Sequence, residues 1–224
     1  MKKYLLLLLL VPFFASAAFA QKVKISVDEK NEKIGDGSHN CLVVTIYDAN
    51  KDDVMKEWKS KMKDYNAKVS GKDEVFADNA MIKEISDNTV DVYARAEKGS
   101  NDNEVKFIVG FQMGEDWLSS SKYPSQFKAA EKIVKDFATK MTKDAIGDKV
   151  KMAEKALDKL KDEKSDLEKK NKDLHDDITD YQDKIKKAES DIKTNEDDQA
   201  KKQAEVDAQQ KVTDELKARQ NSVE

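Results

Sequence analysis

The sequence has few of the residues from which active sites and covalent cross-links are built. One cysteine and two histidines occur in 224 residues. A single cysteine excludes an internal disulfide, and no second pair of ligands at zinc spacing accompanies the histidines. The chain also lacks the glycine-rich sequences G-x-x-x-x-G-K-[ST] and G-x-G-x-x-G that bind nucleotide phosphates. We therefore predict no catalytic residue, no metal site and no cofactor, and we expect that the protein is not an enzyme.

Glycine and proline are also scarce, with 7 and 2 residues, and neither occurs after Gly147. Residues 146–224 hold 18 basic and 22 acidic residues, about half of that segment. A charged segment without helix-breaking residues predicts a long helix. A helical hairpin that turns near Thr194–Asp198 is the competing interpretation.

A long apolar run occurs only at the N-terminus. Lys2 and Lys3 precede an apolar stretch over 5–14, and an Ala-Phe-Ala sequence ends at Ala20. This pattern predicts a signal peptide over 1–20 with cleavage before Gln21, and an uncleaved anchor is the alternative. We expect an exported protein, periplasmic or extracellular and bacterial in style, with no transmembrane segment in the mature chain.

The charge balance is acidic. The full chain has a net charge of −4, and removal of Lys2 and Lys3 leaves 39 basic against 45 acidic residues. A general nucleic-acid binder needs a basic face to neutralise phosphates. We therefore predict no nucleic-acid partner.

Residues 21–145 alternate between strand-like and helix-like patterns. A stripe of methionines and aromatics predicts a helix over 51–65, capped by Asn50 or Asp48, and a second apolar stripe predicts a helix that begins at Pro124. Consecutive strands with short links favour antiparallel pairing. The expected fold is α+β, an antiparallel sheet with two covering helices. The predicted strands are 22–27, 41–47, 67–70, 74–77, 80–86, 89–97 and 104–112, with a loop over 28–40.

Three side chains in this domain have a functional and a structural interpretation. Cys41 opens an apolar run, which favours a buried position in a strand over intermolecular pairing. His39 lies near Asp36 and Cys41, but two further metal ligands are missing. Trp117 either packs over the sheet edge or marks a contact site. In each case we favour the structural interpretation.

Residues 146–222 carry a seven-residue repeat. With Val150 at position a, the a and d positions continue without a skip for ten heptads. Such a repeat predicts a long α-helical coiled coil, strong over 150–192 and weak over 193–222, that associates with itself or with a partner helix. Acid-then-base pairs four residues apart, such as Asp166–Lys170, favour the helix itself. The predicted interface residues are Val150, Ala153, Leu157, Leu160, Leu167, Asn171, Leu174, Ile178, Tyr181, Ile185, Ala188 and Ile192.

Three functions fit these features. The first is a non-enzymatic exported protein that oligomerises or spaces through its coiled coil and presents the α+β domain for binding or structure, with an envelope protein as a further partner. The second is a periplasmic holdase-type chaperone, because a β-containing body with helical arms after a signal peptide is similar in layout to the periplasmic Skp chaperone. The third is a small-ligand or lipid-binding module that uses the concave face of the sheet, with the coil as a spacer.

Overall fold

The protein is described by a computed structural model over residues 23–222. The predicted signal peptide, with its cleavage site at Ala20 and Gln21, lies outside this range. The described residues form seven strands and two helices, which confirms the predicted α+β class. The strands are β1 (Val27–Ile34), β2 (Gly37–Tyr47), β3 (Lys68–Ser70), β4 (Glu74–Ala80), β5 (Val90–Lys98), β6 (Glu104–Met113) and β7 (Asp116–Trp117), and the helices are α1 (Lys51–Asp64) and α2 (Pro124–Asn221).

The strands form one antiparallel sheet in the order β1-β2-β6-β5-β4-β3, and β7 pairs with the end of β6. β2 pairs with β6 only from Leu42, which lies opposite Val109. Further along β6, the partner strand is β7, with Trp117 opposite Gln112. The first residues of β2 are therefore free of β6.

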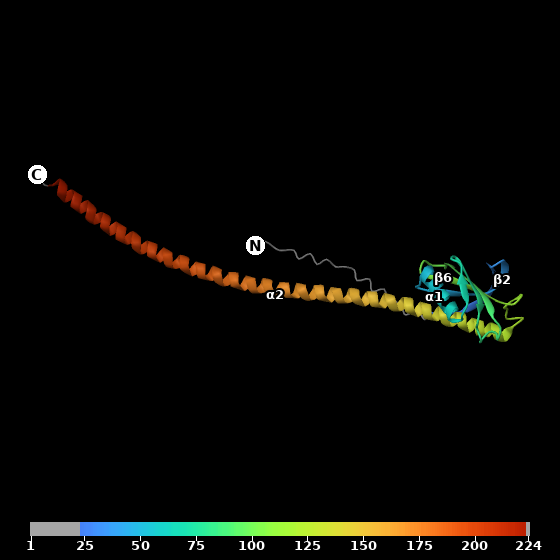
Figure 1. Cartoon of the computed structure of the whole chain (residues 1–224). Helices are drawn as coiled ribbons and strands as arrows, with labels where there is room; N and C mark the ends of the chain where they lie inside the picture. The colour runs from blue at the N-terminus through green and yellow to red at the C-terminus, as the bar shows by residue number, and fades with distance from the viewer. Residues whose placement is uncertain (1–22, 223–224) are drawn as a thin grey trace. The chain divides into compact units, whose positions relative to one another are not determined.

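Helix α1 and the first turns of α2 cover one face of the sheet (Figure 1). Asn50 caps α1, because its side-chain oxygen accepts a hydrogen bond from the Asp53 N–H at 2.8 Å. Trp58 of α1 is fully buried, and its ring lies edge-on to Phe107 of β6 and Phe137 of α2, with centroids 5.1 and 4.9 Å away. The stripe of methionine and aromatic side chains on α1 is thus part of the core.

The prediction of a loop over 28–40 is wrong, because β1 and the start of β2 occupy it as a hairpin. The strand expected over 22–27 is also wrong for 23–26, which is not in a strand. β1 is an edge strand, and most of its side chains are exposed, so its sequence VDEKNEKI has little apolar alternation. Gly35 makes the turn with φ +63°, a conformation that favours glycine.

The strand predicted over 80–86 is wrong as well. Ile82 and Ile85 are both buried, but they are three residues apart in a turn, where the Ile85 N–H donates to the Ile82 carbonyl at 2.9 Å. A three-residue spacing brings both side chains to one side without strand alternation. The preceding irregularity between Ala77 and Ala80 ends the regular register of β4.

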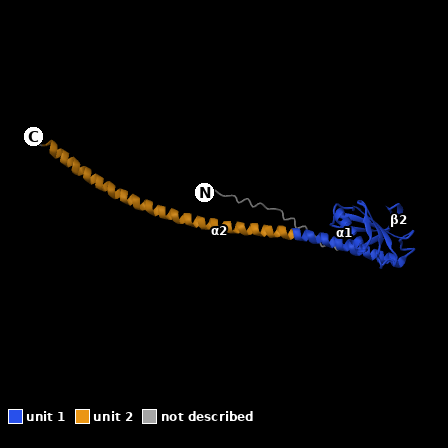
Figure 2. Ribbon diagram, viewed as in Figure 1, with its two compact units in different colours: residues 1–152 blue, residues 153–224 orange. Residues whose placement is uncertain are grey.

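Helix α2 is continuous for 98 residues. The helix predicted from Pro124 and the helical segment predicted over 146–222, here called the tail, are therefore parts of one element. The chain divides into two compact units, one up to Met152 and one from Ala153 onward (Figure 2). The first unit contains the sheet, α1 and the packed turns of α2, and the second is the rest of α2.

Candidate functional site

The a and d side chains of α2 from Val150 to Ile192, here called the heptad stripe, are exposed along its whole length. Among its large apolar side chains, exposure is lowest at Val150, with 48%, and highest at Leu167, with 68%. Large apolar side chains with about half or more of their surface exposed are unusual when they recur in register. The structure places all twelve predicted interface residues on this helix and leaves each of them exposed.

A single helix cannot bury such a stripe. Within the described residues, the part of α2 from Ala153 onward forms a unit by itself. Most helical stability in proteins comes from packing of the apolar face rather than from intrinsic propensity. The heptad stripe is therefore a surface suited to another helix.

Ion pairs along the tail join neighbouring turns. They differ from the acid-then-base pairs predicted from the sequence: Lys164 Nζ lies 3.2 Å from Glu168, and Lys159 Nζ lies 3.5 Å from Glu163. All four side chains are more than half exposed. Each exposed side chain has several partners within reach at little cost in energy, so the sequence alone does not select one pairing.

A second candidate surface lies on the outer face of the sheet, the face opposite the helices. The hairpin arm, residues 27–41, bends across it. The Gly35 N–H donates to Glu74 of β4 at 2.9 Å, and Glu32 contacts Arg95 of β5 and Lys106 of β6. β4 is four strands from β1 in the sheet, about 19 Å at the usual strand spacing. Direct contact therefore requires the arm to lie over the sheet.

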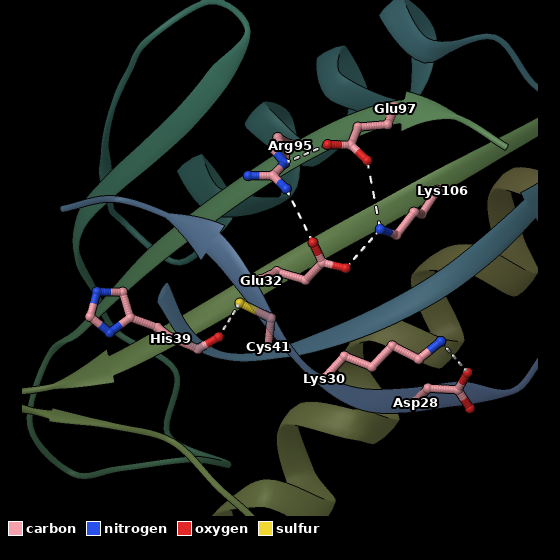
Figure 3. Close-up of polar contacts among 8 residues, drawn as sticks. All are labelled: Asp28, Lys30, Glu32, His39, Cys41, Arg95, Glu97 and Lys106. Atoms are coloured by element: carbon pink, nitrogen blue, oxygen red, sulfur yellow. Dashed lines mark hydrogen bonds and ion pairs between the residues drawn. The ribbon is translucent and has the colours of Figure 1, made fainter. Parts of the chain in front are cut away.

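Four charged side chains close into a cluster beneath the hairpin arm (Figure 3). Glu32 lies 3.3 Å from Arg95 and 2.7 Å from Lys106, and Glu97 lies 2.9 Å from Arg95 and 3.7 Å from Lys106. The Glu32 side chain is only 17% exposed. Because the two acids and two bases neutralise each other, the cluster is suited to holding the arm in place.

An aromatic row crosses the outer face next to this cluster. His39 and Trp117 are stacked, with ring centroids 3.9 Å apart and planes at 7°. Tyr93 lies 5.2 Å from Trp117, and Phe76 lies 4.7 Å from Tyr93. Trp117 thus packs against the sheet, as predicted. Its stacking on His39 was not predictable, because His39 lies in a segment whose sequence is typical of a loop.

Cys41 is buried in a small second core between the hairpin arm and the sheet. Its thiol donates a hydrogen bond to the His39 carbonyl oxygen at 3.4 Å, and the residue is 1% exposed. Burial, with the nearby negative charge of Glu32 as a smaller cause, raises the pKa of the thiol to about 11. A neutral, buried thiol is a poor nucleophile. The second core consists of Ile34, Cys41, Val43 and Ile108, with Tyr93 and Trp117 partly buried against it.

Among residues 23–222, no three His, Cys, Asp or Glu side chains are grouped to hold a metal ion. Of the three residues His39, Asp36 and Cys41, only the first two are in contact, with His39 Nε2 2.8 Å from Asp36 Oδ1. The Cys41 thiol donates to the His39 carbonyl oxygen instead. His175 is exposed on the tail. These groups do not converge on one point.

An open depression of about 490 Å³ lies beside α1. Its charged lining consists mostly of lysines, of which Lys59 donates to the Gly71 carbonyl at 2.9 Å. The lining contains no buried polar side chain that lacks a partner. It is a basic surface, without the convergent polar groups of a small-molecule site.

Comparisons with protein-family models, with curated proteins and with solved structures gave no match. In the described part of the chain, no helix is both long enough and apolar enough to span a membrane.

Proposed function

We propose that this is a non-enzymatic exported protein that associates with a second copy of itself through the heptad stripe and presents its α+β domain for binding or structural work. The observation that carries the proposal is the exposure of the stripe at nine large apolar side chains in one unbroken register. They are Val150, Leu157, Leu160, Leu167, Leu174, Ile178, Tyr181, Ile185 and Ile192.

The energetics favour pairing. Burial of a whole side chain of this size contributes roughly 1.5–3 kcal/mol, so the exposed half contributes about 1 kcal/mol. The gain recurs nine times on each of two chains, which exceeds the cost of lost translational and rotational freedom, about 4–15 kcal/mol. A second copy carries an identical register, so it matches the stripe along its whole length.

Sedimentation equilibrium of the chain from Gln21 onward tests the proposal. The variant Leu167→Glu/Ile178→Glu places two carboxylates in the stripe. Its matched control, Ser165→Glu/Thr179→Glu, places the same charges on outward b positions of the same turns. We expect dimers for the unsubstituted protein and the control, and monomers for the stripe variant. A monomeric unsubstituted protein at high concentration would refute self-association.

Export has a separate test. When the full chain is expressed in a bacterial host, we expect the protein in the periplasmic fraction to lack its first 20 residues and to begin at Gln21. Intact-mass measurement distinguishes this product from the uncleaved chain. Retention of Lys2 and Lys3 in a cytoplasmic product would contradict export.

A further inference from the structure

We infer that the two copies lie parallel and in register, and that Asn171 fixes both properties. The inference rests on the proposed self-association and adds the direction and alignment of the partner. It depends on where the few polar residues of the heptad stripe lie.

Among the a and d positions of the strong segment over 150–192, Lys164 and Asn171 are polar, and both are a positions. Every d position of that segment is aliphatic or aromatic, and the Tyr181 hydroxyl is the one polar group among their side chains. The d residues are Ala153, Leu160, Leu167, Leu174, Tyr181 and Ala188.

This asymmetry distinguishes the two directions. In a parallel pair, a residues face a residues of the partner, whereas in an antiparallel pair they face d residues. An antiparallel alignment within the strong segment therefore places Asn171 against alanine, leucine or Tyr181, and never against a second amide. A buried polar group without a hydrogen bond is costly. In a parallel pair, the two amides can bind each other.

The same residue selects the alignment. A shift of one heptad places Asn171 opposite Lys164 of the other chain at one layer and opposite Ile178 at another. In both layers the pairing of two amides is lost. Only the unshifted parallel alignment brings Asn171 onto its equivalent, which is the arrangement in which a single polar a residue specifies register.

Lys164 is compatible with this arrangement. Its ammonium group lies 3.2 Å from Glu168 on its own helix, and its aliphatic stem can cover the seam while the charge stays in water. Glu163 and Glu168, which approach each other across a parallel pair, each have a lysine on their own chain, Lys159 at 3.5 Å and Lys164. The local cluster is neutral, so like-charge repulsion across the seam is small.

The remaining flanking charges do not select a direction. Lys149–Glu154 and Lys184–Glu189 attract across a parallel pair, while Asp191–Glu196 repels. These exposed pairs contribute little. The polar layer at Asn171 is therefore the feature that decides between directions.

Disulfide trapping in the otherwise unchanged chain tests the direction. Ala153→Cys and Ala188→Cys each place one thiol at a d position, at opposite ends of the strong segment, and buried Cys41 in the unsubstituted protein is the control for background. In a redox buffer we expect both variants to form a cross-linked dimer in most of the chains. Reduced samples that sediment as dimers but do not cross-link at either position would refute the parallel alignment and leave self-association intact. Reduced samples that sediment as monomers would refute self-association.

The role of Asn171 is tested by Asn171→Leu in each cysteine background, with Thr179→Leu on an outward position as the control. We expect Asn171→Leu to raise the melting temperature of the tail and to reduce the yield of symmetric cross-link by several-fold, because antiparallel and larger assemblies become available. Thr179→Leu is expected to leave the yield unchanged. An unchanged yield for Asn171→Leu, with dimers alone, would show that Asn171 does not fix the direction.

Discussion

At the scale of single residues, Gly110 of β6 leaves room for a neighbouring aromatic side chain on the outer face. A Cβ at this position would lie 2.7 Å from Trp117 Cζ3 and 3.4 Å from Cys41 Sγ. The glycine thus allows the indole of Trp117 to lie close against the strand. The packing of Trp117 depends on a residue type that is usually unfavourable in a strand.

We predict that Gly110→Ala lowers the free energy of unfolding by about 1–3 kcal/mol, because the added methyl forces Trp117 from its place. Gly147→Ala in α2 is the control, since a Cβ there has no neighbour within 4 Å. It should raise helix stability by about 0.5–1 kcal/mol. Urea unfolding followed by tryptophan fluorescence measures the first effect, and loss of helix by circular dichroism measures the second. Equal stability of Gly110→Ala and the unsubstituted protein would show that the outer face repacks freely.

A second prediction concerns Cys41 and alkaline pH. Its pKa is raised from 9.0 to about 11 in the folded protein. The neutral thiol is favoured by the fold, so its stabilising contribution is complete below pH 9 and is lost as the pH rises toward 11. The free energy of unfolding should therefore fall less between about pH 8 and about pH 10.5 in Cys41→Ala than in the unsubstituted protein. Urea titrations at both pH values measure the difference. Parallel losses in the two proteins would place the thiol in a more exposed setting.

Some of these residues were predictable from the sequence and some were not. The burial of Cys41 is confirmed, because a continuous apolar run predicts a covered strand without knowledge of its neighbours. The stacking of His39 on Trp117 was not predictable. The two residues lie far apart in the chain, and neither the loop-like sequence around His39 nor the segment around Trp117 carries a periodic pattern that relates one to the other.

At the scale of elements, the hairpin arm is held on the sheet by charges. Glu32 contacts Arg95 and Lys106 at 3.3 and 2.7 Å and is largely shielded from water. Removal of Glu32 leaves Arg95 and Lys106 to share one carboxylate, that of Glu97, in a partly buried network. The arm should therefore be more sensitive to Glu32 than to exposed ion pairs elsewhere in the domain.

We predict that Glu32→Ala destabilises the domain by roughly 1–3 kcal/mol and speeds amide hydrogen exchange in β1 and the first residues of β2. Asp102→Ala is the control, because Asp102 and its partner Lys98 are 88% and 73% exposed. It should change neither quantity measurably. Hydrogen exchange with mass spectrometry provides the comparison, and equal exchange in the two variants would mean that apolar contacts alone hold the arm.

The elements themselves were predictable to different extents. Both helices were found because their apolar residues recur at three- and four-residue steps, and β6 because its residues alternate. β1 was missed because an edge strand with exposed side chains has the composition of a loop. The bend of the hairpin arm over the sheet depends on contacts of the arm with β6, β5 and β4. These strands are distant in the sequence, so no local pattern predicts the contacts.

At the scale of the whole molecule, the two compact units depend on different contacts. The unit up to Met152 contains its own apolar core, whereas the unit from Ala153 onward is a single helix. Under the proposed self-association, a second chain stabilises the second unit by mass action. The first unit needs no partner for its core.

We therefore predict two thermal transitions that respond differently to protein concentration. Both tryptophans, Trp58 and Trp117, lie in the first unit, so their fluorescence reports only its unfolding. Circular dichroism at the helix band reports both units. On dilution by two orders of magnitude, the dichroism transition of the tail should move to lower temperature, while the fluorescence transition stays in place. A tail transition independent of concentration would indicate that the helix is stable alone.

The general organisation of the molecule was predictable because composition changes sharply along the chain. The abundance of charge and the absence of glycine and proline beyond Gly147 indicated a long helix, and the structure has one. The identity of what covers the heptad stripe does not follow from composition. A repeat gives the spacing of an interface, whereas the direction of the proposed pair depends on single residues such as Asn171.

The exposed tail also has a consequence for how long a chain survives. Its 18 basic residues offer many cleavage points to trypsin-like proteases, which accept only segments that have locally unfolded. Where opening and closing are fast, the rate of cleavage follows the population of the open form. In the proposed pair, association lowers that population along the strong segment, so a chain without a partner would be degraded before a paired one. The heptad stripe would thereby couple the abundance of the protein to its assembly.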